Sequence, residues 1–299
     1  MIIRNLQLAV VRKLVAASVH AAKGLDLAGM RAQFDRASRL LPKVAGVASE
    51  AVDAGGVPAE WLRPEGAEQG RAILYLHGGG FVMGSIESHR TLAARVAIAA
   101  RAPVLAINYR LAPEHPFPAG LDDALLAYRW LTREVELDPP KLALVGDSAG
   151  GGLAISAALR IRGHEDLEPC GAIACMSAWV DLTCSAPSLS TADDPTMEEP
   201  YVRKMAQAYL AGEDPRTPEA SPLFADLRGL PPILLQAGGA EALRDDSQRF
   251  AERCEAAGVE VTLQVWDEMF HGFQAWAMML DDGKRAIEQL GAFVRSKTS

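Results

Sequence analysis

Apolar runs of four to seven residues alternate with helical patterns through most of this 299-residue chain, and this alternation restricts the fold most. Because such runs have no polar face, they suit strands of a parallel sheet that helices cover on both sides. The pattern therefore predicts an α/β fold with a doubly wound sheet. The predicted strands are residues 72–76, 104–108, 142–145, 172–175, 233–236 and 259–265, and the main predicted helices are residues 88–100, 121–134, 152–162, 245–257 and 284–296. Residues 47–53 and 57–62, on either side of two glycines, predict an antiparallel hairpin before the first of these strands.

Residues 1–45 and 188–212 do not fit the alternation and carry helical patterns of their own. We expect them to form a helical cap over one end of a core made of residues 46–187 and 213–299. One stripe of the first helix is predicted to pack on that core: Ile3, Leu6, Val10, Leu14 and Ala17. Arg12 and Lys13 interrupt the apolar run that a signal peptide or a membrane span would need. This predicts a cytoplasmic protein with no membrane span.

Charge and cysteine content exclude two classes of function. The formal net charge is -8 and no dense run of Lys and Arg is present, so we expect no nucleic-acid partner. The four cysteines lack the close paired spacing of a zinc site, and we expect reduced thiols and no bound metal.

Residues 146–150 read Gly-Asp-Ser-Ala-Gly, a G-x-S-x-G pattern between a predicted strand and a predicted helix. A serine on such a tight turn exposes its hydroxyl at the end of the sheet, so Ser148 is the predicted nucleophile. A phosphate-binding loop is the alternative interpretation. It would need a G-x-G start after the first strand of its unit, and this segment has neither.

His77-Gly78-Gly79-Gly80 follows the predicted strand 72–76 directly. Acyl transfer places negative charge on a carbonyl oxygen, and fixed backbone N–H groups stabilise that charge. We predict that the N–H groups of Gly78, Gly79 and Ala149 form this oxyanion hole, while the His77 ring has a structural role.

His271 follows the last predicted strand and is the predicted general base, because the chain order in this kind of site is serine, acid, histidine. Three carboxylates follow strand 233–236. Glu241 lies in the loop beyond the strand, whereas Asp245 and Asp246 begin the next helix, where acids are common for their effect on the helix dipole. We favour Glu241 as the acid and leave the two aspartates open. A carboxylate partner predicts a His271 pKa near or above ~6.5.

These motifs, together with Tyr-Arg-Leu-Ala-Pro-Glu-His-Pro-Phe-Pro-Ala at 109–119 and His-Gly-Phe at 271–273, resemble the bacterial hormone-sensitive-lipase family of carboxylesterases. The resemblance implies an α/β-hydrolase fold with eight strands, no cofactor and short- to medium-chain acyl esters as substrates. It aligns Glu241 with the family's catalytic aspartate, and it implies the same nucleophile and oxyanion donors. A homodimer is a frequent arrangement in the family and is a further expectation. The same triad would also suit a lactone hydrolase or an amidase, whereas a non-catalytic ligand receptor would typically have lost the base.

The substrate pocket is predicted from apolar residues near the nucleophile and in the cap, namely Phe81, Trp179, Val180, Met205 and Tyr209. A closed pocket gains ~0.8 kcal/mol per buried CH₂ until it is full. We therefore expect the best substrates to have about four to eight acyl carbons, from the same argument.

Overall fold

The computed structural model describes residues 2–39 and 43–299. Its centre is an eight-stranded sheet in the order β1-β2-β4-β3-β5-β6-β7-β8, antiparallel at β1–β2 and β2–β4 and parallel elsewhere. The strands are β1 (Val47–Asp53), β2 (Pro58–Pro64), β3 (Ala72–Leu76), β4 (Val104–Ile107), β5 (Leu142–Asp147), β6 (Ala172–Met176), β7 (Ile233–Gly238) and β8 (Val261–Trp266). Every residue of β3 and β6 is buried, which explains why these strands are apolar throughout. The predicted α/β-hydrolase fold is confirmed.

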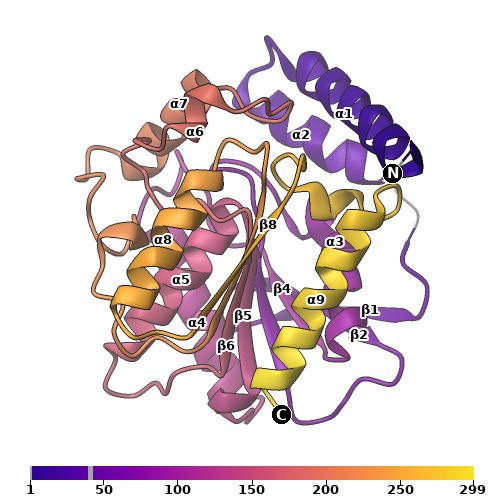
Figure 1. Ribbon diagram of the computed structural model, residues 1–299. Helices are drawn as coiled ribbons and strands as arrows, with labels where there is room; N and C mark the ends of the chain where they lie inside the picture. The colour runs from indigo at the N-terminus through magenta and orange to yellow at the C-terminus, as the bar shows by residue number, and fades with distance from the viewer. Residues whose placement is uncertain (1, 40–42) are drawn as a thin grey trace.

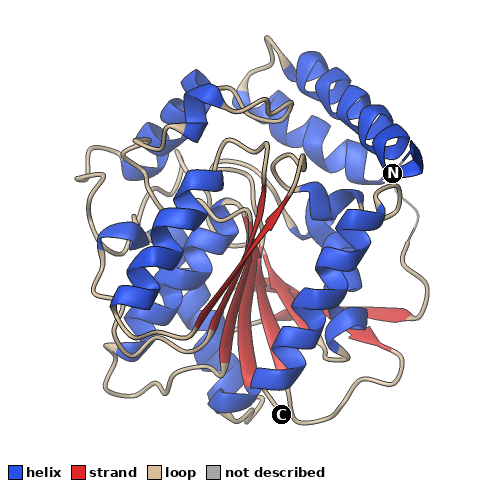
Figure 2. Ribbon diagram, in the orientation of Figure 1, coloured by secondary structure: helices blue, strands red, loops and turns tan. Residues whose placement is uncertain are grey.

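Helices cover both faces of this sheet, as Figure 2 shows. On one face, α3 (Ile86–Ala100) and α9 (Asp281–Lys297) pack together over the inward side chains of the central strands. On the other face lie α4 (Ala119–Arg133), α5 (Ala149–Arg162) and α8 (Arg244–Ala256). The parallel strands therefore end at one common edge, where the loops that follow β3, β5, β7 and β8 meet.

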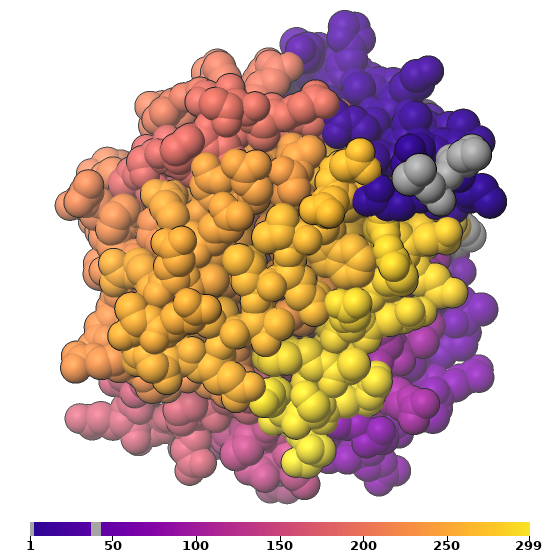
Figure 3. Space-filling view, in the orientation of Figure 1, coloured from indigo at the N-terminus to yellow at the C-terminus, as the bar shows by residue number. Residues whose placement is uncertain are grey.

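Four further helices lie together over one end of the sheet: α1 (Ile2–Ala22), α2 (Leu27–Arg39), α6 (Ser188–Thr191) and α7 (Glu199–Leu210) (Figure 1). The space-filling view shows the N-terminal helices adjoining the later segment (Figure 3). Two ion pairs join them, Arg12 with Asp193 at 2.7 Å and Lys23 with Glu198 at 2.7 Å. Residues 1 and 40–42 of the expected cap segment 1–45 lie outside the described residues.

Helix α1 packs on the core with the opposite stripe from the one predicted. Leu8, Val11 and Val15 are buried, and they join a cluster with Met269, Phe270, Phe273 and Leu280. The predicted stripe is exposed: Ile3 is 71% exposed, Leu6 65%, Val10 42% and Leu14 46%, and Ala17 is exposed as well. The prediction was wrong because both stripes have helical spacing, and the distant residues that cover one of them cannot be read from the helix itself. Arg4 pairs with Asp282 at 2.6 Å, which fixes the rotation of the helix.

A helix that crosses a bilayer needs a long, predominantly apolar stretch. Within residues 2–39 and 43–299, no helix combines the required length with the required apolar character.

Candidate active site

Ser148 lies between the end of β5 and the start of α5 with a backbone φ of 54° and ψ of -122°. L-residues rarely adopt this conformation, and the local strain is typical of a nucleophile held on a sharp turn. The flanking glycines make the turn possible. A Cβ on Gly146 would lie 2.2 Å from the Gly150 carbonyl oxygen, and a Cβ on Gly150 would lie 2.0 Å from the Leu76 carbonyl oxygen.

The structure brings His271 to Ser148 across 123 residues of sequence. The His271 Nε2 atom lies 2.9 Å from the Ser148 Oγ atom. Burial lowers the pKa of His271, and the nearby charges of Asp194 and Asp147 oppose that effect without reversing it. The expectation of a pKa near or above ~6.5 was wrong, because the removal of the imidazole from water outweighs these carboxylates. A neutral imidazole at this position can accept the serine proton.

Glu241 is completely buried in the loop after β7. One carboxylate oxygen, Oε2, accepts hydrogen bonds from the Ser177 hydroxyl at 2.6 Å and from the Gly238 N–H at 2.8 Å. Its other oxygen, Oε1, and the Nδ1 atom of His271 are both buried, and neither has a hydrogen-bond partner among the described residues. Burial raises the pKa of Glu241 to about 8, although the bonds from Ser177 and Gly238 lower it.

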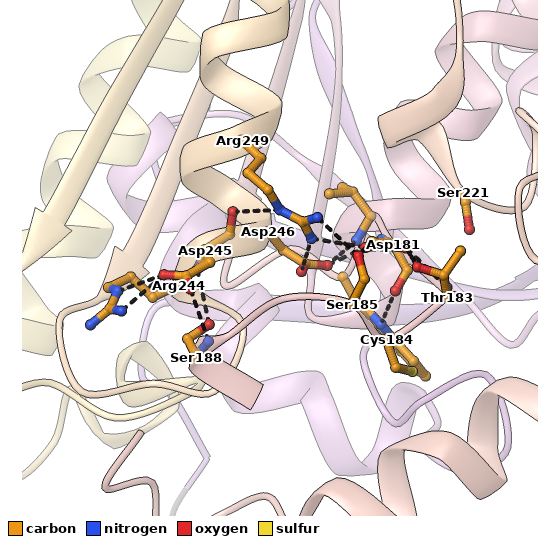
Figure 4. A network of polar contacts seen from close by, with 12 residues as sticks. Asp181, Thr183, Cys184, Ser185, Ser188, Ser221, Arg244, Asp245, Asp246 and Arg249 are labelled. Carbon is orange, nitrogen blue, oxygen red and sulfur yellow. Dashed lines mark hydrogen bonds and ion pairs between the residues drawn. The ribbon is translucent and has the colours of Figure 1, made fainter. Parts of the chain in front are cut away.

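Asp245 and Asp246 are occupied elsewhere (Figure 4). The Asp245 carboxylate accepts the Ser188 N–H at 2.8 Å and pairs with the neighbouring Arg244. The Asp246 carboxylate accepts the N–H groups of Val180 and Asp181, both at 3.1 Å, and pairs with Arg249 at 3.1 Å. Both aspartates therefore anchor the loop that follows β6 to helix α8.

The N–H groups of the glycine run after β3 differ in whether they have an acceptor. The Gly78 N–H donates to the Asp147 carboxylate at 3.1 Å, so it already has an acceptor. Gly79 and Gly80 have φ values of 115° and 62°, and their N–H groups have no acceptor among the described residues. The Ala149 N–H opens helix α5, where the first N–H groups have no intrahelical partner.

A buried network holds this glycine run in place from behind. Besides Gly78, the Asp147 carboxylate accepts the Tyr75 hydroxyl at 2.5 Å and lies 3.3 Å from His89 Nε2. The His77 ring stacks on Tyr109 with centroids 4.3 Å apart, and burial lowers the pKa of His77 to about 3. These contacts hold the glycine loop after β3 in a fixed position, in agreement with a structural role for His77.

Four of the five expected pocket residues gather near Gly80. The Phe81 ring stacks on Tyr209 with centroids 3.9 Å apart and lies 5.7 Å from Trp179. A Cβ on Gly80 would lie 2.2 Å from the Met205 sulfur, so α7 closes directly over the glycine run. Val180, the fifth, is completely buried.

Two polar residues that the sequence did not single out connect the parts of the site. The Ser177 hydroxyl, directly after β6, donates to Glu241 and accepts the Gly272 N–H at 3.1 Å. The Asp194 carboxylate accepts the Ala242 N–H at 2.8 Å and the His271 N–H at 3.3 Å. The only sequence signal for Ser177 was its position after a parallel strand, at the edge where Ser148 also lies.

No group of three or more His, Cys, Asp or Glu side chains within the described residues could hold a metal ion. The cysteines are free and buried: Cys170, Cys175, Cys184 and Cys254.

Comparison with known proteins gives concordant results. Residues 73–275 match the model of a family described as having an alpha/beta hydrolase fold. An acetyl-hydrolase of Streptomyces hygroscopicus is 42% identical over 98% of this chain and 97% of its own length, and an esterase of Acinetobacter venetianus is 33% identical over 95% and 94%. The crystal structure of an esterase from the bacterial hormone-sensitive lipase family superimposes with a TM-score of 0.94 and 40% identity, over 98% of each chain.

Proposed function

We propose that this chain, which belongs to the bacterial hormone-sensitive lipase family of α/β-hydrolase esterases, cleaves short- to medium-chain acyl esters through a covalent acyl-enzyme on Ser148. As a member of that family it is a carboxylic ester hydrolase. The observation that carries the finer proposal is the 2.9 Å contact between Ser148 Oγ and His271 Nε2 on a strained turn.

In the first half of the reaction, the Ser148 Oγ atom attacks the ester carbonyl carbon while His271 Nε2 takes the hydroxyl proton. The carbonyl oxygen becomes an oxyanion, and we assign its hydrogen-bond donors to the N–H groups of Gly79, Gly80 and Ala149. Gly78 is left out of the proposed hole, in contrast to the prediction from sequence, because its N–H is bonded to Asp147. When the intermediate collapses, the bond to the alcohol oxygen breaks and His271 gives its proton to the leaving alcohol.

In the second half, a water molecule attacks the acyl carbon and gives its proton to His271 Nε2. The second tetrahedral intermediate uses the same three N–H groups. Its collapse releases the carboxylic acid and returns the proton to Ser148. Atoms and protons balance, since one ester and one water yield one alcohol and one acid.

Glu241 is the proposed acid of the triad. Its unpaired Oε1 atom and the unpaired His271 Nδ1 atom are complementary buried groups, and such groups are costly to leave without partners. A bond between them would fix the imidazole tautomer that leaves Nε2 free to accept a proton. The engagement of Asp245 and Asp246 in other contacts supports this assignment.

The proposed substrate range follows from the cap. Helix α7 places Met205 against Gly80 and Tyr209 against Phe81, which limits the space beside the nucleophile. The acetyl-hydrolase name of one relative supports a short acyl group as well. Lactones and anilides use the same acylation chemistry and are the alternative substrates to be tested.

The test combines labelling with a substrate series. A fluorophosphonate should modify Ser148, and Ser148→Ala should reduce ester hydrolysis by several orders of magnitude with the fold intact. Full inactivation with an unmodified Ser148 would refute the nucleophile. Among p-nitrophenyl esters, kcat/KM should be highest at about four to eight acyl carbons, because a closed pocket fills at that length. An optimum at about twelve carbons or more would refute the closed pocket.

A further inference from the structure

We propose that Asp194, a carboxylate of the cap segment, is a positioning residue that couples the seating of the cap to the orientation and the charge of the catalytic base. The inference rests on the proposed roles of Ser148 and His271. It concerns a segment far from both of them in sequence, since Asp194 and His271 are 77 residues apart.

The first argument is the pattern of hydrogen bonds that meet at this carboxylate. Asp194 Oδ2 accepts the backbone N–H of His271 itself, at 3.3 Å, and the N–H of Ala242, which follows the proposed acid, at 2.8 Å. A single oxygen therefore ties the loop after β8 to the loop after β7. The base and the acid stand on these two loops, so their relative position depends on a side chain from the cap.

The second argument is that the carboxylate is itself held in place. Its other oxygen, Oδ1, accepts the Thr196 N–H at 2.9 Å and the Thr196 hydroxyl at 2.6 Å. The preceding residue, Asp193, is bound by Arg12 of α1 through both its carbonyl and its carboxylate, at 2.8 and 2.7 Å. Contacts of the residues on both sides of Asp194 therefore hold its segment in place. A shift of the cap would move the Asp194 carboxylate, and with it the two loops that it binds.

The third argument is electrostatic. The negative charges that act on the imidazole are those of Asp194 from the cap and Asp147 at the end of β5. Proton transfer from Ser148 makes the imidazole positive, and a fixed negative charge beside it stabilises that state. Asp194 opposes the effect of burial on the His271 pKa more strongly than Asp147 does. The negative charge of Asp194 should therefore stabilise the transition state, in addition to the effect of its hydrogen bonds on the position of the base.

The experiment compares Asp194→Asn and Asp194→Ala with the matched control Asp193→Asn. In Asp194→Asn the amide oxygen can take the place of Oδ2 and still accept both N–H groups. The amide NH2 then takes the place of Oδ1, where it loses the bond from the Thr196 N–H and can donate to the Thr196 hydroxyl. This variant therefore removes the charge and keeps the link between the two loops. We expect Asp194→Asn to lower kcat about 10- to 100-fold with KM within about twofold. The acid limb of its pH profile should move to lower pH, because the imidazolium has lost a nearby anion. Asp194→Ala should lower kcat further, since two N–H groups lose their acceptor.

Asp193→Asn should behave like the wild type in kcat and in pH profile, because Arg12 keeps its bond to the residue 193 carbonyl. The inference is overturned if Asp194→Asn matches this control in both, or if it changes KM alone. If Asp194→Ala does not fold, Asp194→Asn decides the question. Ester hydrolysis by Ser148→Ala at the wild-type rate would instead refute the proposed function, and that outcome is independent of any result at residue 194.

Discussion

Replacing Glu241 with glutamine should change how the stability of this protein depends on pH. Burial raises the pKa of this carboxyl from 4.5 to about 8 in the folded state. Below pH 4.5 both the folded and the unfolded chain hold the proton, so the group does not affect folding. Between pH 4.5 and 8 the unfolded chain ionises and the folded chain does not, and the free energy of unfolding falls as the pH rises. Above pH 8 the loss is complete.

The size of the effect follows from the width of that interval. Each pH unit corresponds to about 1.4 kcal/mol, so the wild type should lose roughly 3 kcal/mol between pH 5 and pH 7 through this group, with about 5 kcal/mol as the upper limit. Glutamine has no proton to lose. It can still accept the Ser177 and Gly238 hydrogen bonds through its amide oxygen. Relative to the wild type, Glu241→Gln should therefore gain roughly 3 kcal/mol between pH 5 and pH 7.

The assay is urea unfolding of both proteins at pH 5 and pH 7, with Glu288→Gln on the surface as the control for the substitution itself. The control should show the wild-type difference between the two pH values. If Glu241→Gln also shows that difference, the buried carboxyl is not protonated in the folded state and the reasoning fails. Above pH 8, where Glu241 is ionised, the same variant should lower kcat by a factor on the order of 10⁴, because the amide can hold the wrong imidazole tautomer. Near wild-type kcat in Glu241→Gln, with loss of activity in Asp245→Asn, would move the acid to Asp245.

Three further outcomes are expected. Ser177→Ala removes a donor to Glu241, and it should lower both kcat and the free energy of unfolding, the latter by about 1–3 kcal/mol in a urea titration. Unchanged kcat would show that the hydroxyl does not hold the acid. Gly80→Ala should reduce kcat/KM about tenfold or more, because the new methyl group meets the Met205 sulfur beside an oxyanion donor. Adding Met205→Ala should restore part of the loss, and no restoration would refute the clash. In a pH profile, log kcat/KM should change slope near pH 8, where the proposed acid Glu241 ionises, and again below ~6.5, because burial lowers the pKa of His271. A second change of slope at or above ~6.5 would contradict the lowered pKa of His271.

Most of the sheet could be predicted because a parallel strand that is buried on both faces consists of consecutive apolar residues. The central parallel strands β3, β5 and β6 consist almost entirely of apolar residues, and turn residues separate each of them from a helix. The packed face of α1 could not be predicted in the same way. Both of its stripes are apolar with helical spacing, and the contacts of the packed face come from distant residues such as Met269 and Asp282, the latter 278 residues from Arg4.

The same distinction applies to the candidate site: residues placed by their neighbours in sequence could be predicted, and those placed by long-range contacts could not. Ser148 could be predicted because strand, turn and helix are contiguous around it, and His271 because its loop follows the last strand. A run of three glycines, however, does not reveal which N–H groups are free. That depends on Asp147, which reaches Gly78 across 69 residues. Asp194 could not be predicted at all, since only the fold brings it to the loops of the acid and the base.

The packing of α1 also has a consequence for the order in which the protein is completed during synthesis. Leu8, Val11 and Val15 leave the ribosome long before Met269 and Phe270, which pack against them, have been made. Translation proceeds at about 5–20 residues per second, so the 278 residues from Arg4 to Asp282 take roughly 15 to 55 s. Until those residues are made, the buried face of the helix lacks the side chains that cover it. When α1 packs, it contacts Met269 and Phe270, the two residues directly before His271. We therefore expect the packing of α1 and the ordering of the loop that carries the base to occur in the same folding step.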